Sequence, residues 1–397
     1  MTVGTYRTLL AVGLVLVFFT NAANYGLNFG VPPVFWIAAF AAATAPLVVI
    51  DLFRTGLRIA PIGVWGFAYL LVSFAWFVPS SQSAAAWQQV QTRVLSVVFL
   101  VLAVYLFSEA RALRAARAAI VASTLLTVAL NLYEVAFPMT FSDIPGRASG
   151  LFANVNQSGA ALVLGLILGA EALRPGLRLP YALAVGLGIL ATVSRAAILG
   201  WGLVMALWAA RRGNRGPAIA AGALVVAAAA LLLLSPWWAG VEQALAERGV
   251  LTENVRERLD VFGGGNLAES STLERQQLAA LGWSAFEDHP LAGAGTGAST
   301  ERPFELGPHN MYLAMMVDHG FIGLFLLPTL LLAAVWGADV SRAPDVVPFV
   351  VFLAFWGFFS HNVLEERYIL LAVAFVAAEV AGLRRSSATA GPVPVAA

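Results

Sequence analysis

Residues 239–308 read AGVEQALAERGVLTENVRERLDVFGGGNLAESSTLERQQLAALGWSAFEDHPLAGAGTGASTERPFELGP, a long polar stretch in a chain that is otherwise almost entirely apolar. His309 and Asn310 follow it directly. All four histidines lie in this stretch, in the helix predicted after it, or in the last loop predicted on the same side: His289, His309, His319 and His361. Because histidine titrates nearest neutrality, this grouping indicates proton-handling chemistry at one membrane face.

The composition around this stretch predicts an all-α, polytopic membrane protein. Of the 397 residues, 60% are hydrophobic and 11% are charged, whereas soluble proteins carry roughly 25% charged residues. Apolar runs of about 20 residues can cross a ~30 Å hydrocarbon core as helices. We expect about twelve transmembrane helices, at 6–23, 33–50, 59–79, 94–108, 118–137, 157–173, 179–193, 196–210, 217–238, 311–336, 345–359 and 366–383. We interpret the first as a retained helix rather than a signal peptide.

The same pattern divides the chain into four parts. We expect a membrane domain at 1–238, a helical loop domain at 239–308, a second membrane domain at 309–385 and a disordered tail at 386–397. Within the loop domain, helical spacing covers 241–261. Ser271 and Glu274 form a capping box for a second helix that should end near Asp288, before Pro290.

The placement of basic residues predicts the orientation. The chain has no lysine, so all 23 basic residues are arginines. With the N-terminus in the cytoplasm, most of them fall on the inside, and 239–308 lies outside. Four arginines fall in short outer loops instead: Arg93, Arg147, Arg195 and Arg367.

These outer arginines are candidates for ligand binding. Arg195 follows Thr192-Val193-Ser194 at a tight junction between two spans, where a charge is costly. Arg147 lies in GRASGLFANVN, residues 146–156, whose glycines and asparagines need polar partners beside a membrane. Guanidinium groups bind phosphate and diphosphate through two parallel hydrogen bonds. The alternative, for any one of them, is an interfacial anchor that reaches the lipid headgroups.

The sequence gives little support for a metal site, for thiol catalysis or for nucleic-acid binding. There is no cysteine, which excludes disulfides and thiol catalysis. Asp288 and His289 could form a ligand pair, but no third ligand is in view, so we expect no metal site and no cofactor. The net charge of +1 gives no footprint for nucleic acid.

His309 is the candidate general base. It follows Gly307-Pro308, and proline is favoured at helix starts, so we expect His309 and Asn310 in the first exposed helical turn. There the helix dipole favours a neutral imidazole, which can accept a proton. The alternative is an ordinary capping histidine. His361-Asn362 repeats the dipeptide, and we expect a structural role for it, as for His319. Gly293–Gly297 is interpreted as a flexible lid or re-entry loop.

The order of these motifs resembles the O-antigen ligase and polymerase superfamily of bacterial envelope enzymes. The matching residues are Arg147-x-Ser-Gly-x-Phe-x-Asn-x-Asn, Thr192-x-Ser-Arg195, Glu274-Arg275, His289-Pro-Leu-x-Gly-x-Gly-x-Gly, Pro308-His-Asn-x-Tyr-Leu and Gly320-x-Ile-Gly323. The resemblance covers roughly residues 145–330. The outer loop is compact for this family, so recognition of the acceptor could differ.

The resemblance implies a metal-independent glycosyltransferase in the bacterial inner membrane, with both termini cytoplasmic and the loop domain periplasmic. Its donor would be an undecaprenyl-diphosphate-linked glycan, and its acceptor lipid A–core in a ligase or a second lipid-linked glycan in a polymerase. His309 would be the base, with the diphosphate bound by three arginines: Arg147, Arg195 and Arg275. Supporting residues would be Asn154, Asn156, Asn310, Tyr312 and His361.

A transporter of an anionic lipid or sugar is the competing hypothesis. It would explain the spans and the arginines equally well. It does not explain a histidine at the mouth of a loop on one face, because transport needs access from both sides.

Overall fold

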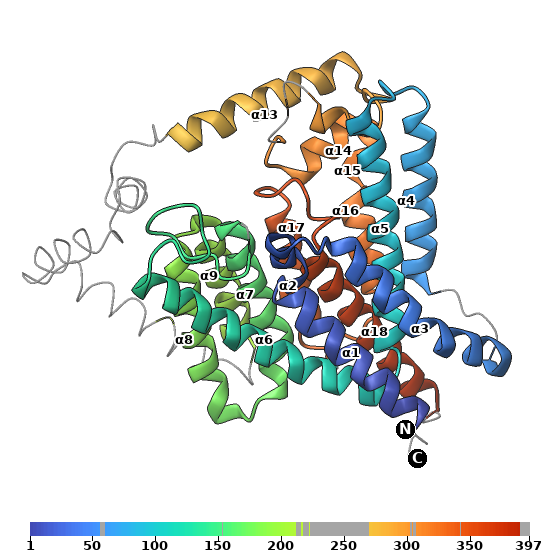
Figure 1. Cartoon of the computed structure of the whole chain (residues 1–397), viewed down its shortest axis with the longest axis vertical. Helices are drawn as coiled ribbons and strands as arrows, with labels where there is room; N and C mark the ends of the chain where they lie inside the picture. Colours follow the sequence, from blue (N-terminus) through green and yellow to red (C-terminus); the bar gives the residue numbers. More distant parts are fainter. Residues whose placement is uncertain are drawn as a thin grey trace, which may run out of the picture. The chain divides into compact units, whose positions relative to one another are not determined.

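The computed structural model describes residues 1–55, 60–152, 154–211, 216, 222, 270–301, 304, 307–341 and 343–389. Within these ranges the chain is helical and contains no strand (Figure 1). The predicted all-α class is therefore confirmed. The chain divides into two compact units: unit 1 comprises 1–18, 33–116 and 275–397, and unit 2 comprises 19–32 and 117–274.

Unit 1 is built around two long helices, α5 and α18, that pack against each other. The element bounds are α1 Val3–Phe19, α3 Pro33–Thr55, α4 Pro61–Phe77, α5 Ala84–Phe107, α13 Ser270–Asp288, η3 Ala298–Thr300, α14 Met311–His319, α15 Phe321–Leu324, α16 Leu326–Ala334, α17 Val346–Trp356 and α18 Arg367–Thr389. In α18, the apolar run from Tyr368 to Val380 is buried almost without interruption. Such all-round burial marks it as the central helix of the unit.

Unit 2 is built around α7, which is buried along nearly its whole length. Its elements are α2 Ala22–Tyr25, η1 Gly26–Phe29, most of α6 Ala110–Ala136, α7 Val155–Gly169, η2 Ala170–Ala172, α8 Pro175–Thr192 and α9 Arg195–Ala209. A Cβ at Gly165 would lie 2.0 Å from the Thr124 hydroxyl, and one at Gly159 would lie 2.5 Å from the Ala197 Cβ. Small residues thus allow α6, α8 and α9 to approach α7 closely, as is common between membrane helices.

Five described helices are long and apolar enough to cross a membrane: Pro33–Phe53, Ala84–Phe107, Ala110–Ala136, Val155–Ala172 and Pro175–Thr192. A sixth candidate is the pair Val3–Phe19 and Ala22–Phe29, which is bent by 64°. Four further apolar helices are shorter, and the predicted span at 217–238 lies almost wholly outside the described residues. The chain therefore carries several apolar helices compatible with a membrane protein, but the expected twelve spans are not confirmed.

Two predicted spans differ from the helices observed. Span 94–108 begins ten residues too late, because α5 starts at Ala84, where the Ser83 hydroxyl accepts a hydrogen bond from the Ala86 amide. The single span expected over 311–336 is broken into α14, α15 and α16. The break occurs at Gly320, whose φ of 62° no helix can continue.

The polar stretch is described only in its second half. The helix predicted from the capping box is α13, which ends at Asp288 as expected and begins one residue before Ser271. The chain from Arg275 onward groups with unit 1, and 239–269 lies outside the described residues. At the other end, α18 continues to Thr389, past the tail boundary expected at Ser386.

Candidate active site

His309 immediately precedes α14 and is not part of it. Asn310 is the N-cap, and its side-chain oxygen accepts a hydrogen bond from the Leu313 amide at 3.2 Å. His309 itself has a φ of 51°, in the left-handed region. The expectation that His309 occupies the first helical turn is therefore wrong, because asparagine is the better cap and takes that position. Left-handed backbone is uncommon at residues other than glycine, although asparagine, aspartate and histidine adopt it more often than the rest.

The imidazole of His309 lies against that of His361. Their ring centroids are 5.5 Å apart and the ring planes are inclined at 72°. Gly307, with a φ of 67°, leaves room for this arrangement: a Cβ there would lie 2.6–2.8 Å from the His361 ring. The two histidines of the repeated His-Asn dipeptide are thus brought together from loops 52 residues apart in sequence.

His361 remains neutral at physiological pH. Burial, and to a smaller extent the nearby His309, lowers the pKa of His361 to about 4. Its buried Nδ1 has no hydrogen-bond partner among the described residues. A neutral His361 adds no positive charge beside His309, so the pair can take up a proton on His309 without like-charge repulsion.

Tyr312 supports this pair by joining α14 to α17. Its hydroxyl donates to the Ala354 carbonyl at 2.9 Å, and its ring lies 4.7 Å from that of Phe358. One residue earlier, the Met311 amide donates to the Gly357 carbonyl at 2.7 Å. These contacts fix the start of α14 against the end of α17, the segment that leads to His361.

Helix α13 packs on the same start of α14. A Cβ at Gly282 would lie 3.0 Å from the Leu313 side chain and 3.5 Å from Pro308, and the rings of Phe286 and Phe321 meet edge to face at 5.1 Å. Arg275, near the first turn of α13, is partly exposed.

A buried ion pair that the sequence analysis did not predict lies behind this site. Arg93 on α5 forms a salt bridge with Asp318 on α14, and both side chains are completely buried. Arg93 also lies 2.6 Å from Nε2 of His319 and 3.4 Å from the Ser73 hydroxyl. The assignment of Arg93 to an outer loop is therefore wrong. Polar residues before Arg93, such as Gln89, obscured the start of α5 in the sequence. The residue that Gln89 contacts, Glu365, lies far along the chain.

Asp318 also holds the glycine-rich loop. Its carboxylate accepts hydrogen bonds from the Gly297 amide at 3.2 Å and the Ser299 amide at 2.8 Å. Gly293, Gly295 and Gly297 all have positive φ, and a Cβ at any of them would meet neighbouring backbone at 2.5–2.6 Å. The expected flexible lid is thus a closely packed connection between α13 and η3.

A half-buried carboxylate, that of Glu365, lies just before α18. Gln89 on α5 donates to Glu365, and Arg367 donates to the Ser96 hydroxyl and the Glu365 carbonyl, both at 2.7 Å. Burial raises the pKa of Glu365, against the opposing effect of Arg93. Arg367, another arginine predicted to lie outside, is therefore committed to holding α18 on α5.

In unit 2, Arg147 is fixed against the end of α8. Its Nε donates to the Thr192 carbonyl at 3.0 Å, and one terminal nitrogen lies 3.4 Å from both the Val193 carbonyl and the Asn156 side-chain oxygen. Asn156 also accepts a hydrogen bond from the Ser194 hydroxyl at 2.8 Å. Part of the guanidinium is therefore used to complete the C-terminus of a helix, where cations are favoured.

The loop that carries Arg147 is shaped by Glu134, which the sequence analysis missed. This carboxylate is 3% exposed and accepts four backbone amide hydrogen bonds, from Phe141, Ser142, Ser149 and Gly150. Asn154 then caps α7 by accepting from the Asn156 amide at 2.8 Å. An acidic residue late in a predicted span, followed by a polar loop, was the available signal.

Arg195 is the first residue of α9, directly after the turn formed by Val193 and Ser194. Val193 has a φ of 49° and ends α8, so the chain reverses within a few residues. Arg195 is partly exposed. The structure therefore brings Arg147, Asn156 and the α8–α9 turn together in unit 2, and His309, His361, Asn310 and Tyr312 together in unit 1. Among the described residues, no group of three histidine or acidic side chains is placed to hold a metal ion.

Part of the chain is similar to a known protein family. Residues 180–327 match the family model described as O-antigen ligase, and the matched range contains Arg195, Arg275, the glycine-rich loop and His309. No curated protein matches the chain. Over these residues the match confirms the resemblance to the O-antigen ligase and polymerase superfamily that the sequence motifs indicated.

Proposed function

We propose that this protein is an inverting glycosyltransferase of the O-antigen ligase type. Its donor is a glycan linked to undecaprenyl diphosphate, and its acceptor is a hydroxyl of lipid A–core on the periplasmic face. The observation that carries the proposal is the His309–His361 pair, because it places two partly exposed imidazoles in contact, and the low pKa of His361 keeps that ring neutral. An imidazole so placed suits removal of a proton from an alcohol.

In the proposed reaction His309 takes the proton of the acceptor hydroxyl while its oxygen attacks the anomeric carbon of the donor sugar. The new glycosidic bond forms as the bond from that carbon to the diphosphate oxygen breaks. Undecaprenyl diphosphate leaves with the bonding electron pair, and the configuration at the anomeric carbon is inverted. Because the base acts only on the acceptor, the leaving group needs its own stabilisation.

We assign that stabilisation to arginines. Arg195 and Arg275 are partly exposed side chains. Arg195 is the first residue of α9, where helix dipole and guanidinium both favour an anion, and Arg275 is the sixth residue of α13, where its own charge would act. Developing negative charge on the diphosphate would be stabilised by these fixed donors. Arg147 has donors committed to Thr192 and Asn156, so we propose that it binds diphosphate less directly and chiefly shapes the Arg195 turn.

The test is reconstituted, purified protein supplied with a lipid-linked glycan, with and without lipid A–core. A ligase consumes donor only when lipid A–core is present and attaches glycan to it. A polymerase lengthens the lipid-linked glycan without that acceptor, which would replace the ligase assignment within the same superfamily. Donor that moves across the bilayer with no new glycosidic bond would support a transporter and contradict the proposal.

A further inference from the structure

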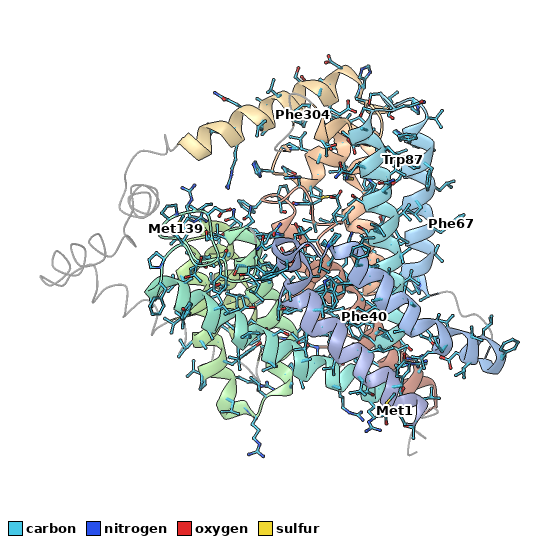
Figure 2. The ribbon with its side chains drawn as sticks, in the orientation of Figure 1. Met1, Phe40, Phe67, Trp87, Met139 and Phe304 are labelled. Carbon is cyan, nitrogen blue, oxygen red and sulfur yellow. The ribbon has the colours of Figure 1, made fainter. Side chains whose placement is uncertain are left out.

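A cavity in unit 1 has no part in the reaction described above. It has a volume of about 220 Å³ and lies between the end of α4, the last turns of α13 and the loop that leads to His309. The residues that matter here are Ser80, Ser81, Ala285, Ala298, Glu301 and Phe304. Figure 2 shows Phe304 beside α13. The volume is below the ~300–1,000 Å³ typical of drug-sized ligands, which suits a single small ring.

The polar side of this cavity is a carboxylate held in one orientation. Oε1 of Glu301 accepts hydrogen bonds from the hydroxyls of Ser81 and Ser83. Its other oxygen, Oε2, has no hydrogen-bond partner among the residues that the structure describes. A fixed carboxylate with a vacant oxygen is a strong acceptor for ligand hydroxyls.

The rest of the lining is apolar and includes small residues. Ala285 and Ala298 leave the space, and Phe304, 6% exposed, forms part of the wall. A sugar ring has matching chemistry, with hydroxyl donors around its edge and C–H groups on its faces. Both sides of the cavity therefore fit a sugar better than an anion, which Glu301 would repel, or a lipid tail, which would leave the carboxylate unpaired.

The cavity walls are rigid and continuous with the histidine pair. The Ala294 amide donates to the Val317 carbonyl at 2.8 Å, and the Asp318 carboxylate holds Gly297 and Ser299. Further along, the Gly307 amide donates to the Phe304 carbonyl at 2.6 Å, and Gly307 lies on the His361 ring. His309 is five positions after Phe304, so their Cα atoms are at most about 18 Å apart. A short oligosaccharide can span that distance.

We propose that this Glu301 cavity is a sugar subsite, which binds a ring of the glycan next to the one that reacts at His309. The inference rests on the proposed function for its reaction but not for its binding. The sugar belongs either to the donor repeat or to the acceptor core, and both offer the same hydroxyl chemistry. The two sources can be separated by kinetics.

The variants are Glu301→Gln, which removes the charge at constant shape, and Ala285→Leu, which fills the cavity. Ala280→Leu, the same change on an exposed face of α13, is the matched control. Loss of a hydrogen bond to a charged group costs about 1.5–3 kcal/mol, which is about tenfold or more in affinity. We expect both cavity variants to raise one KM about tenfold with kcat nearly unchanged, and Ala280→Leu to change neither.

A rise in the donor KM assigns the cavity to the donor glycan, and a rise in the acceptor KM assigns it to the acceptor. If both KM values of both variants stay within twofold of wild type while thermal stability is normal, the subsite is wrong. A second measurement does not need turnover: saturation-transfer NMR with lipid-free repeat and core oligosaccharides on wild type and Ala285→Leu. Binding lost in Ala285→Leu supports the subsite even if wild-type protein transfers no glycan, a result that would contradict only the proposed function. Equal binding in both proteins overturns the subsite.

Discussion

The backbone at His309 adopts a conformation that side chains avoid. Its φ of 51° follows the φ of 67° at Gly307, and between them the chain turns so that one imidazole meets another. Such backbone costs of order 1–3 kcal/mol and persists where the surroundings enforce it, often at functional sites. Here Asn310 and Met311 enforce it from the α14 side.

At Arg195 we predict that Arg195→Lys is nearly as harmful to transfer as Arg195→Ala. Lysine keeps the charge but loses the planar pair of donors that matches a diphosphate. Initial rates at saturating acceptor, measured for both variants against wild type, provide the test. Full activity in Arg195→Lys would mean that a point charge is enough and that the bidentate assignment is wrong. Arg147→Lys and Arg275→Lys should be less severe.

At His361 we predict a pH-dependent contribution to stability. The pKa of His361 is about 4 in the folded protein and about 6.5 in an unfolded chain. Protonation therefore favours unfolding, so this contribution is fully present above pH 6.5 and declines as the pH falls towards 4. The difference in melting temperature between wild type and His361→Gln should shrink over that window. A difference that is constant from pH 7 to pH 4 would contradict the lowered pKa of His361.

At the scale of elements, Asp318 on α14 holds the loop between α13 and α14 in place. Asp318 is the common partner of Arg93 on α5 and of the Gly297 and Ser299 amides. A buried ion pair adds little net stability by itself, but removing one partner leaves an uncompensated charge at a cost of about 3–5 kcal/mol. The pair therefore fixes which surfaces meet, and through them the direction from which the chain reaches His309.

For this loop we predict that Gly297→Ala destabilises the protein by about 2 kcal/mol or more. Gly297 has a φ of 93°, and a Cβ would lie 2.6 Å from the Cα of Ala86. Gly202→Ala is the control, because it lies inside α9 with no atom within 4 Å of its Cβ and should be neutral or stabilising. Thermal melts in detergent compare the two. Equal melting temperatures would show that the loop yields easily and is a flexible lid after all.

Helix boundaries were predicted well where apolar runs were continuous. They were predicted poorly where a polar residue inside a helix is stabilised by a residue far away in the sequence. The end of α13 at Asp288 and the turn before Arg195 both follow from local signals, Pro290 and the Thr-Val-Ser tripeptide. The start of α5 did not, because Arg93 is stabilised by Asp318, which lies 225 residues further along the chain. No local pattern reports a partner at that separation.

At the scale of the whole molecule, the order of the sequence motifs indicated the resemblance that the family model supports over residues 180–327. The motifs from Thr192 to Gly323 lie inside the matched range 180–327, and their order is what a family model measures. The roles of individual residues were harder to predict from the sequence. Asn154 and Asn310 prove to be helix caps, and Tyr312 a link between helices. A motif marks a residue as part of a site, but only the geometry separates a supporting contact from a contact with substrate.

For the intact enzyme we predict that activity survives chelation. Fixed arginines supply the positive charge that a divalent ion would otherwise bring to the diphosphate. EDTA should leave the transfer rate of detergent-purified protein unchanged. The acceptor should be a lipid-free core oligosaccharide rather than intact lipopolysaccharide, whose packing depends on bridging divalent ions. Activity lost with EDTA and restored by Mg²⁺ or Mn²⁺ would contradict this and direct attention to Asp288, His289, Glu365 and Glu366.

The central claim is that the reconstituted protein transfers a lipid-diphosphate-linked glycan with His309 as base. The most direct measurement is the transfer rate of His309→Asn relative to wild type, since asparagine tolerates the left-handed backbone at this position but cannot accept the proton. We predict that the rate falls by about 10²–10⁴-fold while the melting temperature is unchanged. A rate within twofold of wild type would contradict the claim.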